Sequence, residues 1–238
     1  MKKNYREIYN QSINNPEKFW QEVSEDIFWY KKPTKILNKS NPPFYKWYED
    51  GITNTCYNAL DLHIDQGKGD KIALIYDSPI TGKKANFTFK ELKNKVSHFA
   101  GALDNQGIKK GDRVVIYMPM IPEAVVAMLA CGRIGAIHSV VFGGFASNEL
   151  ASRIDDSRAK ILITASCGFE PGRTVEYRPL VDGAIKLAKH KLEKVIFYQR
   201  KDHEIKLNAP LEISWEEALS KSKEMDCVEM GSNEFAYI

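Results

Sequence analysis

The chain has 238 residues, 43% of them hydrophobic and 27% charged, which is enough to build one large globular domain or two small ones around a sizeable core. Its 34 lysines and arginines almost balance its 31 aspartates and glutamates, and they form neither a long block of like charge nor an arginine–aromatic pattern, so no nucleic-acid partner is expected. No apolar run reaches the ~18 residues of a membrane span, and the amino terminus MKKNYREIYN resembles neither a signal nor a transit peptide, so we expect a cytoplasmic protein with no membrane partner.

Residues 1–55 differ in pattern from the rest and are expected to form a separate extension. In NPEKFWQEVSEDIFWYKK, Asn15 is the predicted cap of an amphipathic helix and Pro16 its first residue. The apolar residues at helical spacing are Phe19, Trp20, Val23 and Ile27. The stretch PTKILNKSNPPFYKWYEDGITNT has no sustained periodicity, so we expect an irregular segment held against a larger body by aromatic side chains. These are Phe44, Tyr45, Trp47 and Tyr48.

Regular elements are predicted from residue 58 onward. A helix near CYNALDLHID precedes a hairpin, in which IALIYD and ANFTF alternate around the turn SPITGKK. The TGKK in that turn does not fit the phosphate-binding P-loop pattern, so we interpret it as turn sequence. Thr88 and Glu91 form a capping-box pattern for the next helix, and Gly107 stands past its end.

Four short apolar runs then follow, RVVIYM, AIHSVVF, KILIT and KVIFY, separated by helical stretches. Buried strands that alternate with helices predict an α/β fold with a parallel sheet flanked by helices. In such sheets ligands bind beyond the carboxyl ends of the strands. The loops at Met118–Pro122, Phe142–Ser147 and Thr164–Arg173 are therefore expected to meet at that edge.

Two of these loops could hold an anion. In VFGGFASNEL, Gly143 and Gly144 end a strand and Ser147 or Asn148 is the predicted cap of the next helix, so either free backbone N–H groups bind an anion or the glycines only allow a tight turn.

The loop EPGRTVEYRP also has two readings. Arg173 and Arg178 could offer guanidinium groups to phosphate, with a turn at Pro171–Gly172 directing the first outward. Alternatively, both arginines pair with Glu170 or Glu176.

No other chemistry is evident in the sequence. Cys56, Cys131, Cys167 and Cys227 are far apart and form no CxxC pair, so we expect reduced, mostly buried thiols and no metal site. No serine–histidine–aspartate or cysteine–histidine arrangement is visible, and the five histidines are interpreted as structural. No G-x-G-x-x-G fingerprint follows a strand, which argues against a dinucleotide-dependent oxidoreductase. We therefore predict no catalytic residue in the chain.

The segments GDRVVIYMPMIPEAVVAMLACGRIGAIHSVVFGGFASNELASRIDDSRAKILITASCGFEPGR and FYKWYEDGITNTCYNALD resemble the adenylate-forming acyl-CoA synthetases that make acetyl- or propionyl-CoA. The resemblance extends over nearly the whole chain. It implies an N-terminal extension of the acetyl-CoA synthetase type at 1–55 and, at 56–238, the N-terminal portion of the AMP-binding domain.

The resemblance also implies a binding site for the nucleotide end of coenzyme A. Residue-by-residue matching places Glu170, Pro171, Gly172, Arg173 and Gly144 at that site, with Arg173 facing phosphate. Acetate-type enzymes carry a basic residue at the position of Glu170, so the loop is more similar to that of propionate-type enzymes.

By the same family pattern, the ATP phosphate loop and the catalytic lysine follow after a strand such as EFAYI, beyond this sequence. We therefore expect the N-terminal portion of a propionate–CoA ligase, inactive alone, whose full-length form uses ATP, Mg and coenzyme A. The alternatives are a portion of an acetate–CoA ligase, or a non-catalytic coenzyme A-binding or interaction domain. No pattern indicates an oligomeric state.

Overall fold

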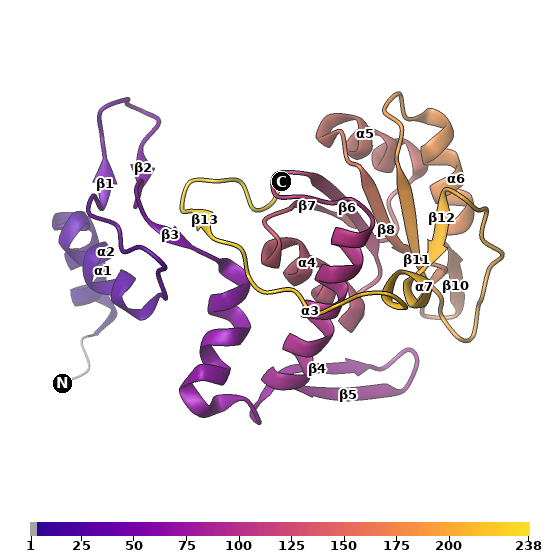
Figure 1. Cartoon of the computed structure of the whole chain (residues 1–238), viewed down its shortest axis with the longest axis horizontal. Helices are drawn as coiled ribbons and strands as arrows, with labels where there is room; N and C mark the ends of the chain where they lie inside the picture. Colours follow the sequence, from indigo (N-terminus) through magenta and orange to yellow (C-terminus); the bar gives the residue numbers. More distant parts are fainter. Residues whose placement is uncertain (1–3) are drawn as a thin grey trace.

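The body of the molecule, on the right in Figure 1, is built on a five-stranded parallel sheet. The structure is a computed structural model that describes residues 4–238, so the first three residues of the predicted extension lie outside it. The strand order is β12-β11-β8-β6-β7, with every neighbouring pair parallel. The strands are β6 (Arg113–Met118), β7 (Ile137–Phe142), β8 (Ile161–Ala165), β11 (Lys194–Tyr198) and β12 (Glu212–Ser214). The prediction of a parallel α/β sheet is confirmed.

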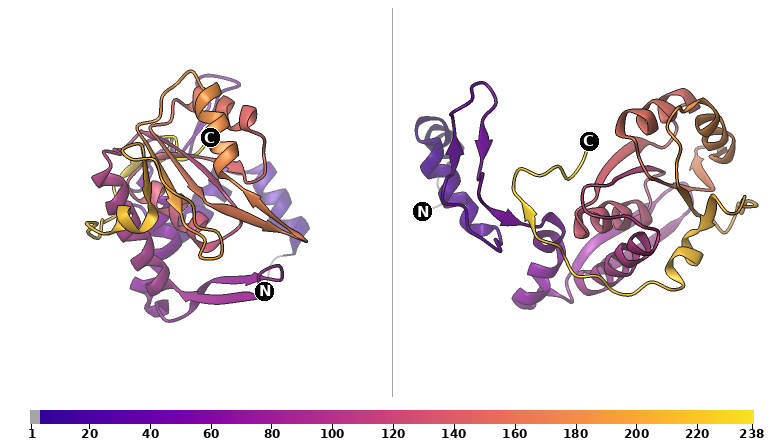
Figure 2. Two further views of the ribbon diagram at one scale, coloured as in Figure 1. Left: turned by 90° about the vertical axis from the view of Figure 1, so that its right-hand side faces the viewer. Right: turned by 45° about the horizontal axis from the view of Figure 1, so that its top comes forward.

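Helices cover both faces of this sheet (Figure 2). On one face α3 (Phe89–Asn105) packs against α4 (Pro122–Arg133) and α7 (Trp215–Leu219), and on the other α5 (Ser147–Ser157) packs against α6 (Arg178–Leu187). Burial on both faces explains why the inner strands are continuous apolar runs, since neither face meets water.

The local signals around α3 are confirmed. The hydroxyl of Thr88 accepts the Glu91 amide N–H, and the Glu91 carboxylate accepts the Thr88 amide, which forms a complete capping box. Before it, β4 (Ile72–Ser78) and β5 (Lys83–Thr88) form the predicted antiparallel hairpin, which packs on α3. The helix expected near CYNALDLHID is present and contains two π-helical segments, η2 (Tyr57–Asp61) and η3 (Ile64–Lys68).

The N-terminal extension differs from its prediction in its helices. Two helices, α1 (Tyr5–Asn14) and α2 (Pro16–Val23), and the short η1 (Ser24–Asp26) replace the single expected helix. Pro16 does begin α2, but the side chain of Asn15 makes no capping hydrogen bond. The capping box that the sequence analysis missed belongs to α1, where Asn4 and Glu7 exchange hydrogen bonds.

The aromatic residues of the extension do not hold it to the body as expected. Phe44 and Tyr45 are exposed. Trp47, in β2 (Lys46–Trp47), makes an edge-to-face contact with Trp20 in α2. The ring of Tyr48 lies against that of Trp29, so both contacts are inside the extension. The extension also contains β1 (Leu37–Asn38), which pairs with β2, and β3 (Ile52–Thr53), which leads into the body. Trp47 and Tyr48 therefore stabilise the extension itself, and the aromatic contact with the body comes instead from Phe28 and Tyr30, whose rings lie 4.3 and 5.9 Å from that of Tyr57.

Residues 220–238, here called the strap, connect the body to the extension (Figures 1 and 2). The strap crosses α3 at Gly101, where any side chain would collide with the carbonyl oxygen of Lys223. It then forms β13 (Met230–Gly231), antiparallel to β3. The predicted strand EFAYI forms only a single parallel bridge, between Tyr237 and His138 of β7.

Arg133, at the end of α4, is fully buried and joins three segments that are distant in sequence. Its two terminal nitrogens donate to the carboxylate of Asp61 at 2.7 and 2.9 Å, and its Nε donates to the carbonyl oxygen of Met225 in the strap at 2.5 Å. The carbonyl oxygen of Arg133 accepts the amide N–H of Val228 at 2.9 Å. The helical segment, α4 and the strap therefore meet at one side chain.

We predict that Asp61→Ala destabilises the protein by about 3–5 kcal/mol, because it leaves the buried guanidinium without its counter-charge. The measurement is the free energy of unfolding from urea denaturation. Asp70→Ala is the matched control, because its carboxylate pairs with Lys90 on the surface and is 88% exposed, so little change is expected. Similar unfolding energies for the two variants would contradict this account of Arg133.

Candidate functional site

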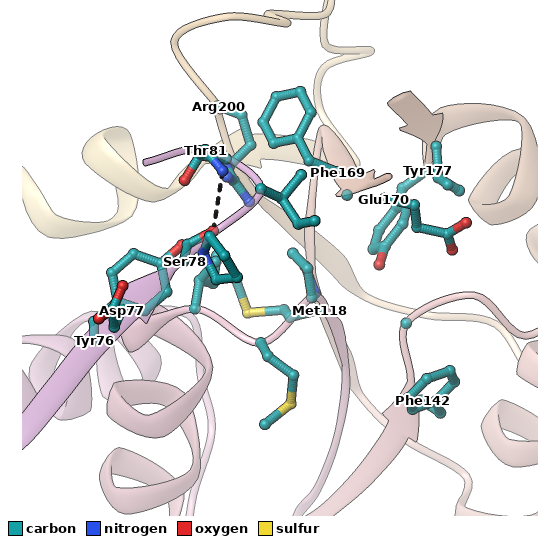
Figure 3. Close-up of a pocket in the computed structure, with 18 of the residues that line it drawn as sticks. Tyr76, Asp77, Ser78, Thr81, Met118, Phe142, Phe169, Glu170, Tyr177 and Arg200 are labelled. Atoms are coloured by element: carbon teal, nitrogen blue, oxygen red, sulfur yellow. Dashed lines mark hydrogen bonds between the residues drawn. The ribbon is translucent and has the colours of Figure 1, made fainter. Parts of the chain in front are cut away.

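A cleft of about 390 Å³ lies at the carboxyl edge of the sheet (Figure 3). The three loops expected to meet there all contribute lining residues, at Met118–Ile121, at Phe142 and Gly143, and at Gly168–Glu170. The turn of the β4–β5 hairpin, around Ser78–Thr81, closes the opposite wall. The prediction of a shared loop edge is confirmed, and the contribution of the hairpin turn is new.

The loop that carries EPGR is itself a hairpin. Strand β9 (Cys167–Glu170) pairs antiparallel with β10 (Arg173–Glu176), and Pro171 and Gly172 form the turn between them. Gly172 has φ 75°, a backbone conformation that glycine adopts without steric cost. The predicted Pro–Gly turn is therefore present, on a more regular element than the expected loop.

A second, outer groove of about 470 Å³ adjoins the cleft along this hairpin. The two hollows share Ile80, Thr81, Phe169 and Glu170 in their walls. Together they form an elongated two-part site between the tips of two hairpins, which suits a long ligand better than a compact one.

The residues predicted to bind coenzyme A lie at different depths in this site. Glu170 lines both hollows, and Gly172 and Arg173 line the outer groove. Pro171 forms the hairpin turn without lining either hollow, and Gly144 stands one residue beyond the cleft wall.

The neighbour of Gly144, Gly143, forms that wall. A side chain at Gly143 would collide with the hydroxyl of Tyr177 and with the carbonyl oxygen of Met118. The close approach of these two groups therefore explains why residue 143 is a glycine, as the tight-turn interpretation of the sequence requires.

The predicted cap of the following helix is wrong. Helix α5 begins after Ala146, without a side-chain cap, and the hydroxyl of Ser147 donates to the carbonyl oxygen of Leu180 instead. That hydrogen bond links α5 to α6.

Arg173 forms an ion pair with Glu170 at the rim of the outer groove, with nitrogen–oxygen distances of 2.6 and 2.7 Å. The two side chains are 70% and 43% exposed. An exposed pair of this kind contributes little free energy, since water screens both charges. The guanidinium of Arg173 can therefore exchange Glu170 for a more highly charged anion at small cost.

Arg178 does not serve the site, so its predicted role in phosphate binding is wrong. Its two terminal nitrogens donate to the buried carboxylate of Glu212 at 2.5 and 2.8 Å, and a third contact reaches Asp182. Hydrogen bonding with Glu212 raises the pKa of Arg178, which keeps this charge in place. The pairing with Glu176 considered from the sequence does not occur; Glu212, 34 positions later, is the partner.

Arg200 is a residue of the site that the sequence analysis missed. It follows β11, is buried, and its guanidinium lies 4.7 Å from the ring centre of Phe169 in the cleft wall (Figure 3). Within residues 4–238 this guanidinium pairs with no carboxylate. The available signal was the position of Arg200 just beyond the carboxyl end of the predicted strand KVIFY.

The cleft and the outer groove carry groups that can bind an anion. The lining residues of the cleft include no histidine or cysteine. Burial raises the pKa of the Tyr177 hydroxyl, so this group stays protonated at the cleft wall. The arrangement can orient an anionic ligand through Arg173 and Arg200, while the lining carboxylates of Asp77 and Glu170 form ion pairs with Lys84 and Arg173.

Comparison with known proteins identifies the family. The family model described as AMP-binding enzyme matches residues 62–238, and the model described as acetyl-coenzyme A synthetase N-terminus matches residues 5–59. The chain belongs to the AMP-binding enzyme family. The resemblance to acyl-CoA synthetases stated from the sequence is confirmed.

Two of the most similar relatives are named as synthetases. The human acyl-CoA synthetase short-chain family member 3, mitochondrial, is 52% identical over 235 residues, which are 98% of this chain and 34% of that protein. The acetyl-coenzyme A synthetase of Streptomyces avermitilis is 43% identical over 215 residues, 90% of this chain and 33% of that protein. The chain thus spans about a third of the length of the curated relatives it matches.

A solved structure supports the fold. The acetoacetyl-CoA synthetase from Streptomyces lividans superposes with a TM-score of 0.87 at 23% identity, over 99% of this chain and 36% of that one. No helix among the described residues is long and apolar enough to cross a membrane. The cytoplasmic location of this chain stays a prediction, because the human relative is named as a mitochondrial protein.

Proposed function

We propose that this chain is the amino-terminal part of an AMP-forming short-chain acyl-CoA synthetase and supplies the binding site for the nucleotide end of coenzyme A. The observation that carries the proposal is the two-part site at the carboxyl edge of the sheet, with Arg173 on its outer rim and Arg200 in its inner wall. Coenzyme A is long and carries both a pyrophosphate and a 3′-phosphate, so it needs an elongated site with separated cationic groups.

In the proposed reaction, a carboxylate and ATP, with Mg, give an acyl-adenylate and pyrophosphate, and the coenzyme A thiol then displaces AMP. We assign adenylation to the part of such proteins that this chain does not span, because the cleft holds no group suited to it. No residue of the chain is proposed as catalytic, and the chain alone is expected to be inactive. Residues 1–55 would form the extension and 56–238 the start of the AMP-binding domain of a cytoplasmic enzyme.

We propose that Arg173 binds the 3′-phosphate of coenzyme A. Its present partner, Glu170, carries a single charge in an exposed ion pair, whereas a phosphate carries nearly two and presents several acceptor oxygens. Gly172 leaves the groove open beside it, since nothing lies within 4 Å of the position of a side chain there. Arg200, held against Phe169, would contact a second anionic group deeper in the site.

Propionate is the proposed carboxylate, with acetate as the alternative. Glu170 stands where acetate-type enzymes carry a basic residue, and this difference supports the propionate type. The printed name of the human relative supports a short-chain acid in general.

The first test is a calorimetric titration with coenzyme A and with 3′-dephospho-coenzyme A. A bidentate charge-assisted contact contributes about 1.5–3 kcal/mol, so the dephosphorylated ligand is expected to bind ~10–100-fold more weakly. Arg173→Ala should remove this difference. Arg153→Ala, at an exposed arginine on α5 away from the site, is the matched control and should keep it. Equal affinity of the unsubstituted protein for both ligands would contradict the assignment of Arg173.

The second test concerns the acid. For the protein that carries this chain, kcat/KM for acyl-CoA formation is expected to be about 10-fold higher with propionate than with acetate, the usual effect of one methylene in an apolar pocket. The assay measures AMP release with each acid at saturating ATP and coenzyme A. An equal preference for acetate would refute the propionate assignment while leaving the coenzyme A site intact.

A further inference from the structure

Two cysteines that are far apart in the sequence lie side by side next to Arg133. Cys56 is fully buried at the start of the helical segment, and Cys227 is partly exposed in the strap. Their sulfur atoms and a carboxylate oxygen of Asp61 all lie within 4.8 Å of one another. All four cysteines are free and three are buried, as expected, but their distance in the sequence gave no sign that Cys56 and Cys227 lie together.

The surroundings of the pair oppose a metal ion. The guanidinium of Arg133 already makes two hydrogen bonds with Asp61, and it lies 3.6 Å from the sulfur of Cys56. A buried permanent positive charge at this distance repels a cation and occupies the carboxylate that would have to bind it. The cluster is better suited to redox chemistry between its two sulfur atoms.

The same surroundings favour the thiolate form of one cysteine of the pair. Hydrogen bonding with the Cys227 thiol holds the pKa of Cys56 below its usual value. The positive charge of Arg133 also lowers this pKa, whereas burial raises it. The corresponding interaction raises the pKa of Cys227, so the proton of the pair resides there. Burial alone raises the pKa of Cys131 to about 12, so this cysteine offers an unreactive comparison within the same core.

We propose that Cys56 and Cys227 are a modification site, where exposure to a hydroperoxide forms a reversible intramolecular disulfide bond between the helical segment and the strap.

The chemistry balances with hydrogen peroxide as the oxidant. The Cys56 thiolate attacks one peroxide oxygen, the O–O bond breaks, and a sulfenic acid forms with release of hydroxide. The sulfur of Cys227 then attacks the sulfur of Cys56, the S–O bond breaks, and the disulfide forms as the thiol proton and the hydroxyl leave as water. The released hydroxide takes up the proton that Cys56 lost when its thiolate formed, so two thiols lose two electrons in total and one peroxide becomes two water molecules.

The bond would add a covalent connection at a place now held by hydrogen bonds. The side-chain amide of Asn54 donates to the carbonyl oxygen of Val228 at 2.8 Å, next to Cys227. Beyond this point the strap forms β13, and its last residues pair with His138 near the amino end of β7. Oxidation would therefore fix the path of the strap without requiring any new contact between segments.

The test treats the protein with hydrogen peroxide, unfolds it and counts its thiols. Four free cysteines are present before treatment, and two are expected afterwards, with all four restored by dithiothreitol. A peptide map under non-reducing conditions should contain one new species that joins Cys56 to Cys227. A loss of thiols that dithiothreitol does not reverse, or a bridge between other cysteines, would overturn the proposal.

Two variants separate this reaction from general oxidation. Cys227→Ser, at a partly exposed position, should abolish the cross-linked peptide, whereas Cys131→Ala should form it as the unsubstituted protein does. Both are checked for folding by circular dichroism. If added Zn²⁺ protected both thiols of the pair from peroxide, the cluster would be a metal site and the disulfide proposal would be wrong.

Discussion

The fold depends on burying one arginine. Removing a guanidinium from water is costly unless its charge is matched and its donors are satisfied, and Arg133 meets this requirement only when Asp61 and the Met225 carbonyl are both in place. Asp61 belongs to the helical segment and Met225 to the strap. If either segment moved away from α4, the buried guanidinium of Arg133 would lose a hydrogen-bond partner in apolar surroundings. The strap in turn pairs with β3 and so determines where the N-terminal extension joins the body. One electrostatic requirement thus organises segments that span most of the chain.

The candidate site follows from a different constraint, the parallel direction of the strands. Because all five strands point the same way, the loops that follow them collect at one edge, and two hairpin tips complete the walls. Two arginines of the same sequence segment differ in role because their partners differ. Arg178 is fixed by the buried carboxylate of Glu212, whereas Arg173 has only the exposed Glu170, so only Arg173 is free to exchange its partner for a phosphate.

Local patterns in the sequence predicted much of this architecture. The apolar runs gave four of the five strands, the Thr88–Glu91 box marked the start of α3, and strand direction placed the three loops together. Several of the errors concern contacts between distant residues. Glu212, the partner of Arg178, lies on β12, which has only three residues, too few for a periodic signal. For the same reason, no local pattern revealed that Arg200 meets Phe169 or that Cys56 meets Cys227.

The most direct test of the central claim is to locate bound coenzyme A by amide chemical-shift mapping on the protein. The account predicts that perturbed amides surround the two-part site, from the hairpin turn at Ser78–Thr81 to Gly168–Arg173 and Arg200, with the junction of β3 and β13 unchanged. Perturbations centred on that junction, or none at saturating ligand, would contradict the claim that the carboxyl edge of the sheet is the binding site.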